Sequence, residues 1–229
     1  MISVIIPTLN EKKNILKIAN KLNKIKIVSQ VIFVDDNSID GTFAEIKKIK
    51  FTKFYGYLRK SKQRDLSQSV VYGVDKANNK NILVMDCDLQ HDVKYIGMMW
   101  KLFIKSNYDV IVASRFKRKK FIGNISFLRS LISKFAIFLI NSVFGTKSSD
   151  PLSGFFLCKK NLINAHKKFF FLRGYKILFD VIYNSKRNIN VKDVEISFKK
   201  RNFEKSKFNT RVIWLFLRQM LYTKLVVKK

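Results

Sequence analysis

The chain has 229 residues, long enough for one domain with a sizeable buried core. Hydrophobic residues make up 47% of it, a fraction that excludes both a disordered chain and a wholly membrane-embedded one. Its 46 Lys and Arg against 16 Asp and Glu give a net charge of +30, which must attract an anion: lipid, nucleic acid or sugar nucleotide.

Short apolar runs alternate with amphipathic segments in the first half of the chain. The runs expected to form strands are Ile2–Pro7, Val31–Asp35, Phe54–Tyr57, Asn81–Asp86 and Asp109–Ala113. The segments expected to form helices are Lys12–Lys24, Thr42–Lys50, Leu66–Ala77 and Val93–Ser106. This alternation predicts an α/β fold with a mostly parallel, Rossmann-like sheet and helices on both faces.

The composition shifts near residue 121 toward long apolar helices. Ile125–Phe144 and Val212–Val227 are rich in Phe, Leu and Ile but are interrupted by basic and polar residues. Neither provides the roughly 20 consecutive apolar residues of a membrane-spanning helix. Two interpretations stay open: amphipathic helices that lie on an anionic membrane surface, or helices that pack on the sheet.

Polar side chains follow three of the predicted strands. They are Asn10 and Glu11, then Asp35 and Asp36, then Asp86 and Asp88. Because ligands of parallel sheets bind beyond the carboxyl ends of the strands, we expect these residues to lie at one edge. Solvation of the surface does not explain such convergence. Nucleic-acid binding, the alternative function that the positive charge suggests, does not explain it either.

The segment MDCDLQHD (85–92) is the clearest candidate for a metal site. Asp86 and Asp88 with the amide of Gln90 provide hard oxygen ligands, which suit Mg²⁺ or Mn²⁺ completed by phosphate and water oxygens. An acidic turn after a strand is the alternative. His91 is expected to support the neighbouring residues rather than to bind the metal.

VDDNSIDGT (34–42) places two carboxylates at the end of a strand. Asp35 or Asp36 could accept hydrogen bonds from a base or ribose. The alternative is helix capping, which Ser38 and Asp40 could provide without them.

Seven motifs occur in register along the chain: PTLNE (7–11), VDDNSIDGT (34–42), RDLSQSVVYG (64–73), MDCDLQHD (85–92), SRF (114–116), DPLSGFF (150–156) and GYKILFDV (174–181). From Ile2 to about Phe208 the sequence resembles the dolichyl- or polyprenyl-phosphate mannosyltransferase branch of glycosyltransferase family 2. The resemblance implies a GT-A fold, a divalent metal, a sugar nucleotide donor (typically GDP-mannose) and a polyprenyl phosphate acceptor. It also implies inversion at the anomeric carbon.

Matched motif by motif, the resemblance assigns roles to particular residues. The nucleoside pocket is lined by Pro7, Asn10, Glu11, Val34 and Asp36. Asp86 sits against the ribose or a metal-bound water, while Asp88 and Gln90 coordinate the metal. The donor or acceptor phosphates are held by Arg115, Arg129 and Ser133, and Arg201 and Lys207 close over the diphosphate.

Asp150 in DPLSGFF is the candidate if a base operates in the reaction. Orienting the acceptor and supporting a loop are equally open roles. No strong base is required, because an acceptor phosphate is already an anion near neutral pH.

Three positions depart from the family pattern. Asp65 stands where the family usually has Gly, so the loop before Leu66 is expected to be less permissive. KRKKFIGN (117–124) lacks the usual paired glycines, and Glu204 replaces the Gly before Ser206 and Lys207. Preference for the sugar and for the acceptor could differ as a result.

The expected organisation is a GT-A domain over residues 1–208, with a nucleotide-sugar half to about 115 and an acceptor half from about 116, followed by an amphipathic basic helix over 209–229.

Cys87 and Cys158 cannot form a disulfide framework, which fits a reducing compartment. We therefore expect a peripheral enzyme on the cytoplasmic face of a membrane that moves mannose onto a polyprenyl phosphate. A separate membrane subunit is left open. The alternative is a related family 2 enzyme that uses UDP-glucose or UDP-N-acetylhexosamine with a lipid-phosphate or glycan acceptor.

Overall fold

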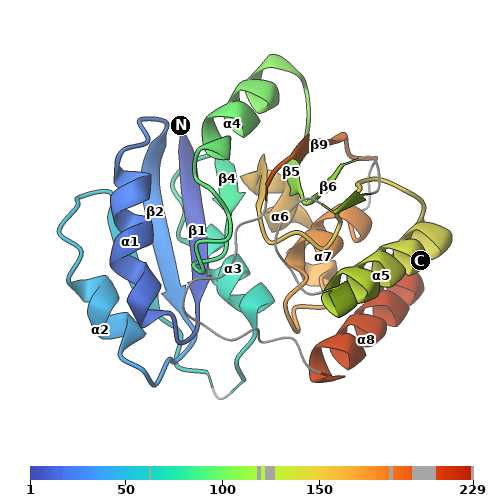
Figure 1. Cartoon of the computed structure of the whole chain (residues 1–229), viewed down its shortest axis with the longest axis horizontal. Coiled ribbons are helices and arrows are strands. Elements are labelled where there is room, and N and C mark those ends of the chain that lie inside the picture. Colours follow the sequence, from blue (N-terminus) through green and yellow to red (C-terminus); the bar gives the residue numbers. More distant parts are fainter. Residues whose placement is uncertain (62, 118–119, 122–126, 186–187, 198–209, 228–229) are drawn as a thin grey trace.

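The computed structural model describes residues 1–61, 63–117, 120–121, 127–185, 188–197 and 210–227. Seven strands form one sheet (Figure 1), in the order β3 (Phe54–Leu58), β2 (Val28–Asp35), β1 (Ile2–Thr8), β4 (Asn81–Val84), β8 (Phe156–Lys159), β5 (Val110–Ser114) and β9 (Val191–Glu195). Only β8 is antiparallel to its neighbours, β4 and β5. The carboxyl ends of the other six strands therefore meet at one edge of the sheet.

Eight α-helices accompany the sheet in the described part of the chain: α1 (Lys12–Asn23), α2 (Thr42–Lys47), α3 (Leu66–Asp75), α4 (Tyr95–Lys105), α5 (Phe127–Phe144), α6 (Lys160–His166), α7 (Ile177–Tyr183) and α8 (Thr210–Val227). A 3₁₀ turn (Lys167–Phe169) and a small hairpin of β6 (Phe116–Lys117) and β7 (Lys120–Phe121) complete the structure.

The core lies in two layers, one on each face of the sheet. Along β1, Val4 and Ile6 join the layer that includes α1 and α4, while Ile5 joins the layer that includes α3 and α7. Because both faces are covered, the strands are apolar throughout rather than alternating. The predicted mostly parallel sheet with helices on both faces is confirmed.

The predicted elements of the first half agree with the structure to within a few residues. The largest differences are that β2 already begins at Val28 and that α2 ends at Lys47. Strand β4 ends at Val84, so Asp86 lies beyond the strand. Seven elements in the described part of the second half were not predicted: strands β6, β7, β8 and β9, helices α6 and α7, and the 3₁₀ turn.

Helices α5 and α8 lie next to each other at one end of the molecule (Figure 1). Each packs one side on α7: Phe144 and Phe216 both meet the Phe179 ring edge-on, at centroid distances of 5.5 and 6.0 Å. The opposite sides are open, with Phe138 63% and Leu221 63% exposed. No helix in the described ranges is long and apolar enough to cross a membrane.

Asp180 on α7 provides a prediction about pH and stability. Burial raises the pKa of its carboxyl to about 7, and hydrogen bonds from Gln219 and Asn184 only partly offset this. Between pH 4 and 7 the unfolded chain loses this proton while the folded chain keeps it, so stability falls as pH rises through this window. Relative to the wild type, Asp180→Asn should therefore gain stability from pH 4 to 7, as measured by urea denaturation. A difference that does not change with pH would contradict the assignment.

Candidate active site

Two loops at the carboxyl edge of the sheet are tied together by hydrogen bonds. The Asn10 N–H donates to Ser38 Oγ at 2.8 Å, and the Ile39 N–H donates to Asn10 Oδ1 at 3.1 Å. The Glu11 N–H donates to Thr42 Oγ1 at 2.8 Å. Asn10 has a φ of 54°, in the left-handed region that Asn tolerates better than most residues. Asn10 thus shapes the loops, whereas Glu11 lines the cleft between the loops and the second half of the chain.

The structure separates the two carboxylates that end β2. Asp35 is used within the loop: it accepts hydrogen bonds from Thr8 Oγ1 at 3.1 Å and from Ser38 Oγ at 2.6 Å. Asp36 lines the cleft and forms an ion pair with Arg59. Burial raises the pKa of the Asp36 carboxyl, and the Arg59 charge opposes this. Asp36 is therefore the carboxylate of this pair that faces the cleft.

The capping interpretation applies to Asp40. Its Oδ1 accepts the Thr42 N–H at 2.9 Å, at the start of α2. Capping in this segment therefore does not involve Asp36.

The acidic segment after β4 forms a tight turn. The Gln90 N–H donates to Asp88 Oδ1 at 3.1 Å, and Leu89 between them has a φ of 62°. Asp86, Asp88 and Gln90 all line the same cleft. The three predicted metal ligands are thus brought together on one wall.

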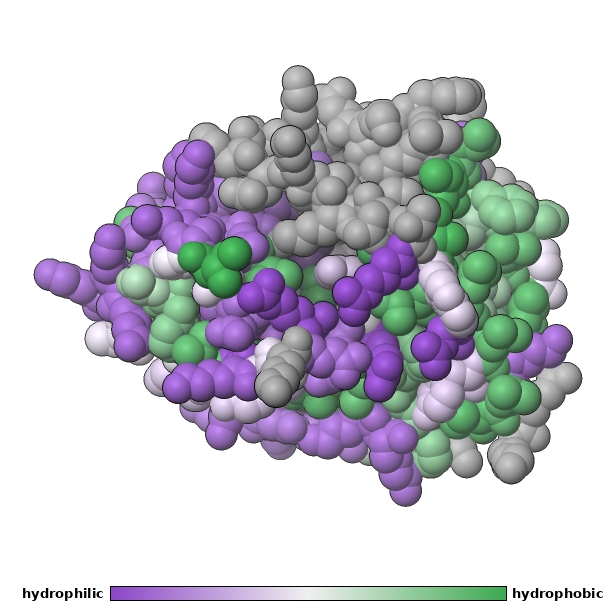
Figure 2. Space-filling model, turned by 90° about the horizontal axis from the view of Figure 1, so that it is seen from below, coloured by the Kyte–Doolittle hydropathy of each residue, from purple (hydrophilic) through white to green (hydrophobic). Residues whose placement is uncertain are grey.

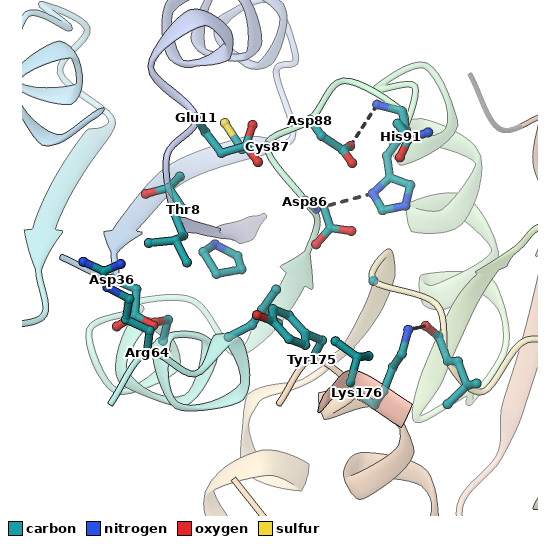
Figure 3. Close-up of a pocket in the computed structure, with 18 of the residues that line it drawn as sticks. Thr8, Glu11, Asp36, Arg64, Asp86, Cys87, Asp88, His91, Tyr175 and Lys176 are labelled. Atoms are coloured by element: carbon teal, nitrogen blue, oxygen red, sulfur yellow. Dashed lines mark hydrogen bonds between the residues drawn. The ribbon is translucent and has the colours of Figure 1, made fainter. Parts of the chain in front are cut away.

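His91 lines the cleft beside this turn and supports it. Its Nδ1 accepts the Asp86 N–H at 3.4 Å, which Figure 3 marks with a dashed line. The imidazole stacks on the Phe155 ring at a centroid distance of 5.1 Å and is only 4% exposed. These contacts agree with the expected supporting role.

Gly154 leaves the space that the Asp86 side chain occupies. A Cβ at position 154 would lie 2.5 Å from Asp86 Oδ2 and 3.0 Å from its Cγ, closer than real contacts allow. The glycine of DPLSGFF therefore fixes where the Asp86 carboxylate can lie.

Arg115, at the end of β5, is held by Asp150 in a two-point contact. Its Nε donates to Asp150 Oδ2 at 2.6 Å and its Nη2 donates to Oδ1 at 2.7 Å. Burial alone would lower the pKa of Arg115, but the charge of Asp150, with a smaller effect of Asp86, raises it above its ordinary value. Because both Asp150 oxygens bind the guanidinium, Asp150 is placed to orient Arg115, which lines the cleft.

The cleft encloses about 1080 Å³ of space, including solvent at its mouth. Figure 3 shows Asp36 and Arg64 toward one end and Asp86, Asp88 and His91 toward the other. Pro7, Glu11 and Arg115 also line it. A cleft lined by carboxylates and by three cations (Arg64, Arg115 and Lys176) suits a ligand that carries both hydroxyl and phosphate groups.

Other predicted residues lie elsewhere. The Val34 side chain is fully buried in the core rather than in the cleft, because β2 is covered on both faces. Ser133 lies on α5 and is not among the residues that line the cleft. The side chain of Arg129 and all of Arg201 and Lys207 fall outside the described residues.

Sequence reasoning assigned no role to Tyr175 and Lys176, which line the cleft just before α7. Both belong to the GYKILFDV motif, so the motif itself was the available signal. Their segment is held by Asp65, whose Oδ1 accepts the Gly174 N–H at 2.8 Å. Asp65 has a φ of −141°, an ordinary extended conformation, so its replacement of the family's Gly causes no strain.

The donor set fits a divalent cation that takes part of its shell from the substrate. Among the residues that the structure describes, no three His, Cys, Asp or Glu side chains converge on a common point. Asp86, Asp88 and Gln90 instead offer two carboxylates and an amide at the wall of an open cleft. Mg²⁺ and Mn²⁺ accept such a partial set of oxygen ligands when phosphate and water complete it.

Two solved structures share this fold. The chain superimposes on glucosyl-3-phosphoglycerate synthase from Mycobacterium tuberculosis, crystallised with Mn²⁺, UDP and glucosyl-3-phosphoglycerate, with a TM-score of 0.73 and 14% identity over 98% of this chain and 78% of that one. Mannosyl-3-phosphoglycerate synthase from Rubrobacter xylanophilus gives a TM-score of 0.74 and 14% identity over 98% and 72%. At such identities the likeness concerns the fold alone.

Sequence comparison finds closer relatives. The chain is 30% identical to a dolichol-phosphate mannosyltransferase of Pyrococcus furiosus over 96% of its own length and 62% of the relative's, so it spans less than two thirds of that protein. It is 28% identical to the Saccharomyces cerevisiae dolichol-phosphate mannosyltransferase over 95% and 85%. Residues 3–166 match the model of glycosyl transferase family 2. With most of its length covered by that model, this chain belongs to glycosyltransferase family 2.

Proposed function

We propose that this protein transfers a hexose, mannose in the first instance, from a nucleoside-diphosphate sugar to a polyprenyl phosphate. The observation that carries the proposal is the cleft, in which the carboxylates of Asp86 and Asp88 and the guanidinium of Arg115 line the same space. The similarity to dolichol-phosphate mannosyltransferases over 95–96% of the chain supports the choice of sugar and acceptor.

In the proposed reaction an oxygen of the acceptor phosphate attacks the anomeric carbon of the sugar. The bond from that carbon to the donor diphosphate breaks, and the nucleoside diphosphate leaves, with inversion at the anomeric centre. A divalent cation held by Asp86, Asp88 and Gln90 would supply Lewis-acid stabilisation of the leaving group.

The protein's own residues contribute binding and charge. Arg115 is buried, held rigidly by Asp150 and always protonated, so it provides a fixed positive charge for a phosphate group. Asp36 and Glu11 line the cleft near the first two strands, and in this proposal they accept hydrogen bonds from the nucleoside. Asp150 binds Arg115 with both oxygens and so orients this charge. No base is needed for the acceptor phosphate, because it is already an anion near neutral pH.

The test is an assay with purified protein, Mg²⁺ or Mn²⁺, a polyprenyl phosphate and a panel of GDP-mannose, UDP-glucose and UDP-N-acetylhexosamines. Mass spectrometry of the lipid fraction should show polyprenyl-phosphate mannose, formed only when metal is present. If only a UDP-sugar gives a lipid product, the transferred sugar is that one and not mannose. Transfer only to a glycan would overturn the acceptor assignment.

We also propose that the outer sides of α5 and α8 bind an anionic membrane surface at the cytoplasmic face. The exposed large apolar residues there are Leu131, Phe135, Phe138 and Val143 on α5 and Ile213, Trp214, Leu217, Leu221 and Leu225 on α8. Figure 2 shows hydrophobic residues gathered at this end of the molecule, whereas the opposite end is mainly hydrophilic. Lys134, Arg211, Arg218 and Lys224 on the same helices add positive charge, which favours anionic lipids.

Replacing both Leu221 and Leu225 by Glu should weaken binding to vesicles of phosphatidylserine and phosphatidylcholine about 100-fold, since burying each leucine contributes at least about 1.5 kcal/mol. Vesicle co-sedimentation measures the change. Ile104→Glu on α4 is the matched control, because Ile104 is 61% exposed at a different surface. Equal losses for the two proteins would show that the binding does not depend on α8.

A further inference from the structure

Asp193, on the edge strand β9, makes three short hydrogen bonds to one segment of the second half. Its Oδ1 accepts from Ser148 Oγ at 2.6 Å. Its Oδ2 accepts from both the Ser149 N–H and Ser149 Oγ, each at 2.6 Å. One carboxylate therefore fixes both the backbone and the side chains of residues 148–149, which immediately precede Asp150.

The same segment reaches Arg115 by two routes. Ser148 Oγ accepts the Asp150 N–H at 3.1 Å, which fixes the residue that grips the guanidinium. Ser149 Oγ lies 2.7 Å from the Oγ of Ser114, the residue just before Arg115. Asp193 is thus connected to Arg115 through bonds that hold both its side-chain partner and its own backbone.

Asp193 itself does not line the cleft, and neither does any other residue of β9. An effect of Asp193 on the reaction must therefore pass through the residues that it holds. Arg115 is the group that depends on them, because a long side chain stays in one conformation only while its partner is fixed.

We propose that Asp193 is a positioning residue for Arg115, acting through Ser148, Ser149 and Asp150. The inference rests on the proposed sugar transfer, in which Arg115 binds a phosphate group. Asp193→Asn replaces one acceptor oxygen by an NH₂ group, which cannot accept the hydrogen bonds that Ser148 or Ser149 donates to that oxygen. We expect it to lower kcat about 10- to 100-fold, in the range expected for a misplaced catalytic group.

A double-mutant cycle with Arg115→Lys separates positioning from general damage. Lysine cannot form the two-point contact with Asp150, so the position of that carboxylate should then matter little. In the Arg115→Lys background, Asp193→Asn should change kcat less than twofold. If it keeps its full effect there, the proposed route is wrong.

Asp109→Asn is the matched control. Asp109 lies just before β5, at the end of the strand pair away from the cleft, and its carboxylate accepts the Asn190 N–H at 3.1 Å and Lys159 Nζ at 3.0 Å. Asp109→Asn also weakens a carboxylate that holds the chain next to β5, here through a backbone N–H and an ion pair with Lys159. It should reduce thermal stability while leaving kcat within twofold. Equal loss of kcat in both variants would also overturn the proposal.

A second measurement does not depend on turnover. In ¹H–¹⁵N spectra of arginine side chains, the Arg115 Nε–H, assigned by its absence from Arg115→Lys, should be protected from exchange in the wild type and in Asp109→Asn. It should exchange rapidly in Asp193→Asn and in the milder variant Ser148→Ala, which serves if Asp193→Asn does not fold. Protection that persists in the folded variants would refute the positioning role. Absence of transfer by the wild type, with these exchange differences present, would instead refute the proposed function alone.

Discussion

Replacement of Asp88 by Ala is expected to lower sugar transfer about 1,000-fold while leaving the fold intact. Asp88 is 3% exposed at the wall of the cleft, and its carboxylate is one of two in the proposed metal-binding set. Loss of one of so few protein ligands should also weaken Mn²⁺ binding, which electron paramagnetic resonance can follow without any substrate. Mass analysis of the lipid product measures the loss of transfer.

Asp92→Ala provides the control for Asp88→Ala. Asp92 belongs to the same acidic segment, but its Oδ1 accepts the Lys94 N–H at 3.2 Å and it does not line the cleft. It should keep nearly full activity and Mn²⁺ affinity. If Asp88→Ala transfers sugar as well as Asp92→Ala, Asp88 is not a ligand and the acidic segment is a structural turn.

Replacement of Gly154 by Ala should lower kcat about 100-fold through a single added methyl group. The new Cβ would lie 2.5 Å from Asp86 Oδ2, so the carboxylate must move away from its position in the cleft. Displacement of a catalytic group by about 1 Å can cost a factor of this size. Steady-state kinetics with the donor identified by the assay measures the effect.

Gly97→Ala is the matched control for Gly154→Ala. Gly97 lies in α4, and a Cβ there would meet nothing within 4 Å. Alanine in a helix should increase stability by about 0.5–1 kcal/mol and leave the kinetics unchanged. Unchanged kinetics in Gly154→Ala as well would mean that the position of Asp86 is not important for the reaction.

The sequence predicted the sheet because its strands are continuous apolar runs such as Ile2–Pro7, and it predicted one side of the site because acids follow those runs. Interactions between distant residues could not be predicted in this way. Arg115 and Asp150 are 35 residues apart, and Asp65 and Gly174 are 109 apart. No local pattern indicates that such residues pair.

Two other gaps have physical causes. Strand β8 is only four residues long (Phe156–Lys159), too short for a pattern of apolar residues to show either its presence or its antiparallel direction. The motif also could not tell which way the Val34 side chain points. A strand buried on both faces has no alternation of polar and apolar residues to orient it.

The direction of β8 has a consequence for any attempt to transplant this site onto another scaffold. Val84 of β4 and Val112 of β5 both pair with Phe156 of β8, so the two strands that lead to Asp86 and Arg115 stand two interstrand spacings apart, about 9.5 Å. Because β8 runs the opposite way, its start brings Gly154 to the same edge. A graft of β4 and β5 as direct neighbours would halve the distance between the strands that carry the acids and the guanidinium. It would also omit the glycine, so all three strands must be moved as one unit.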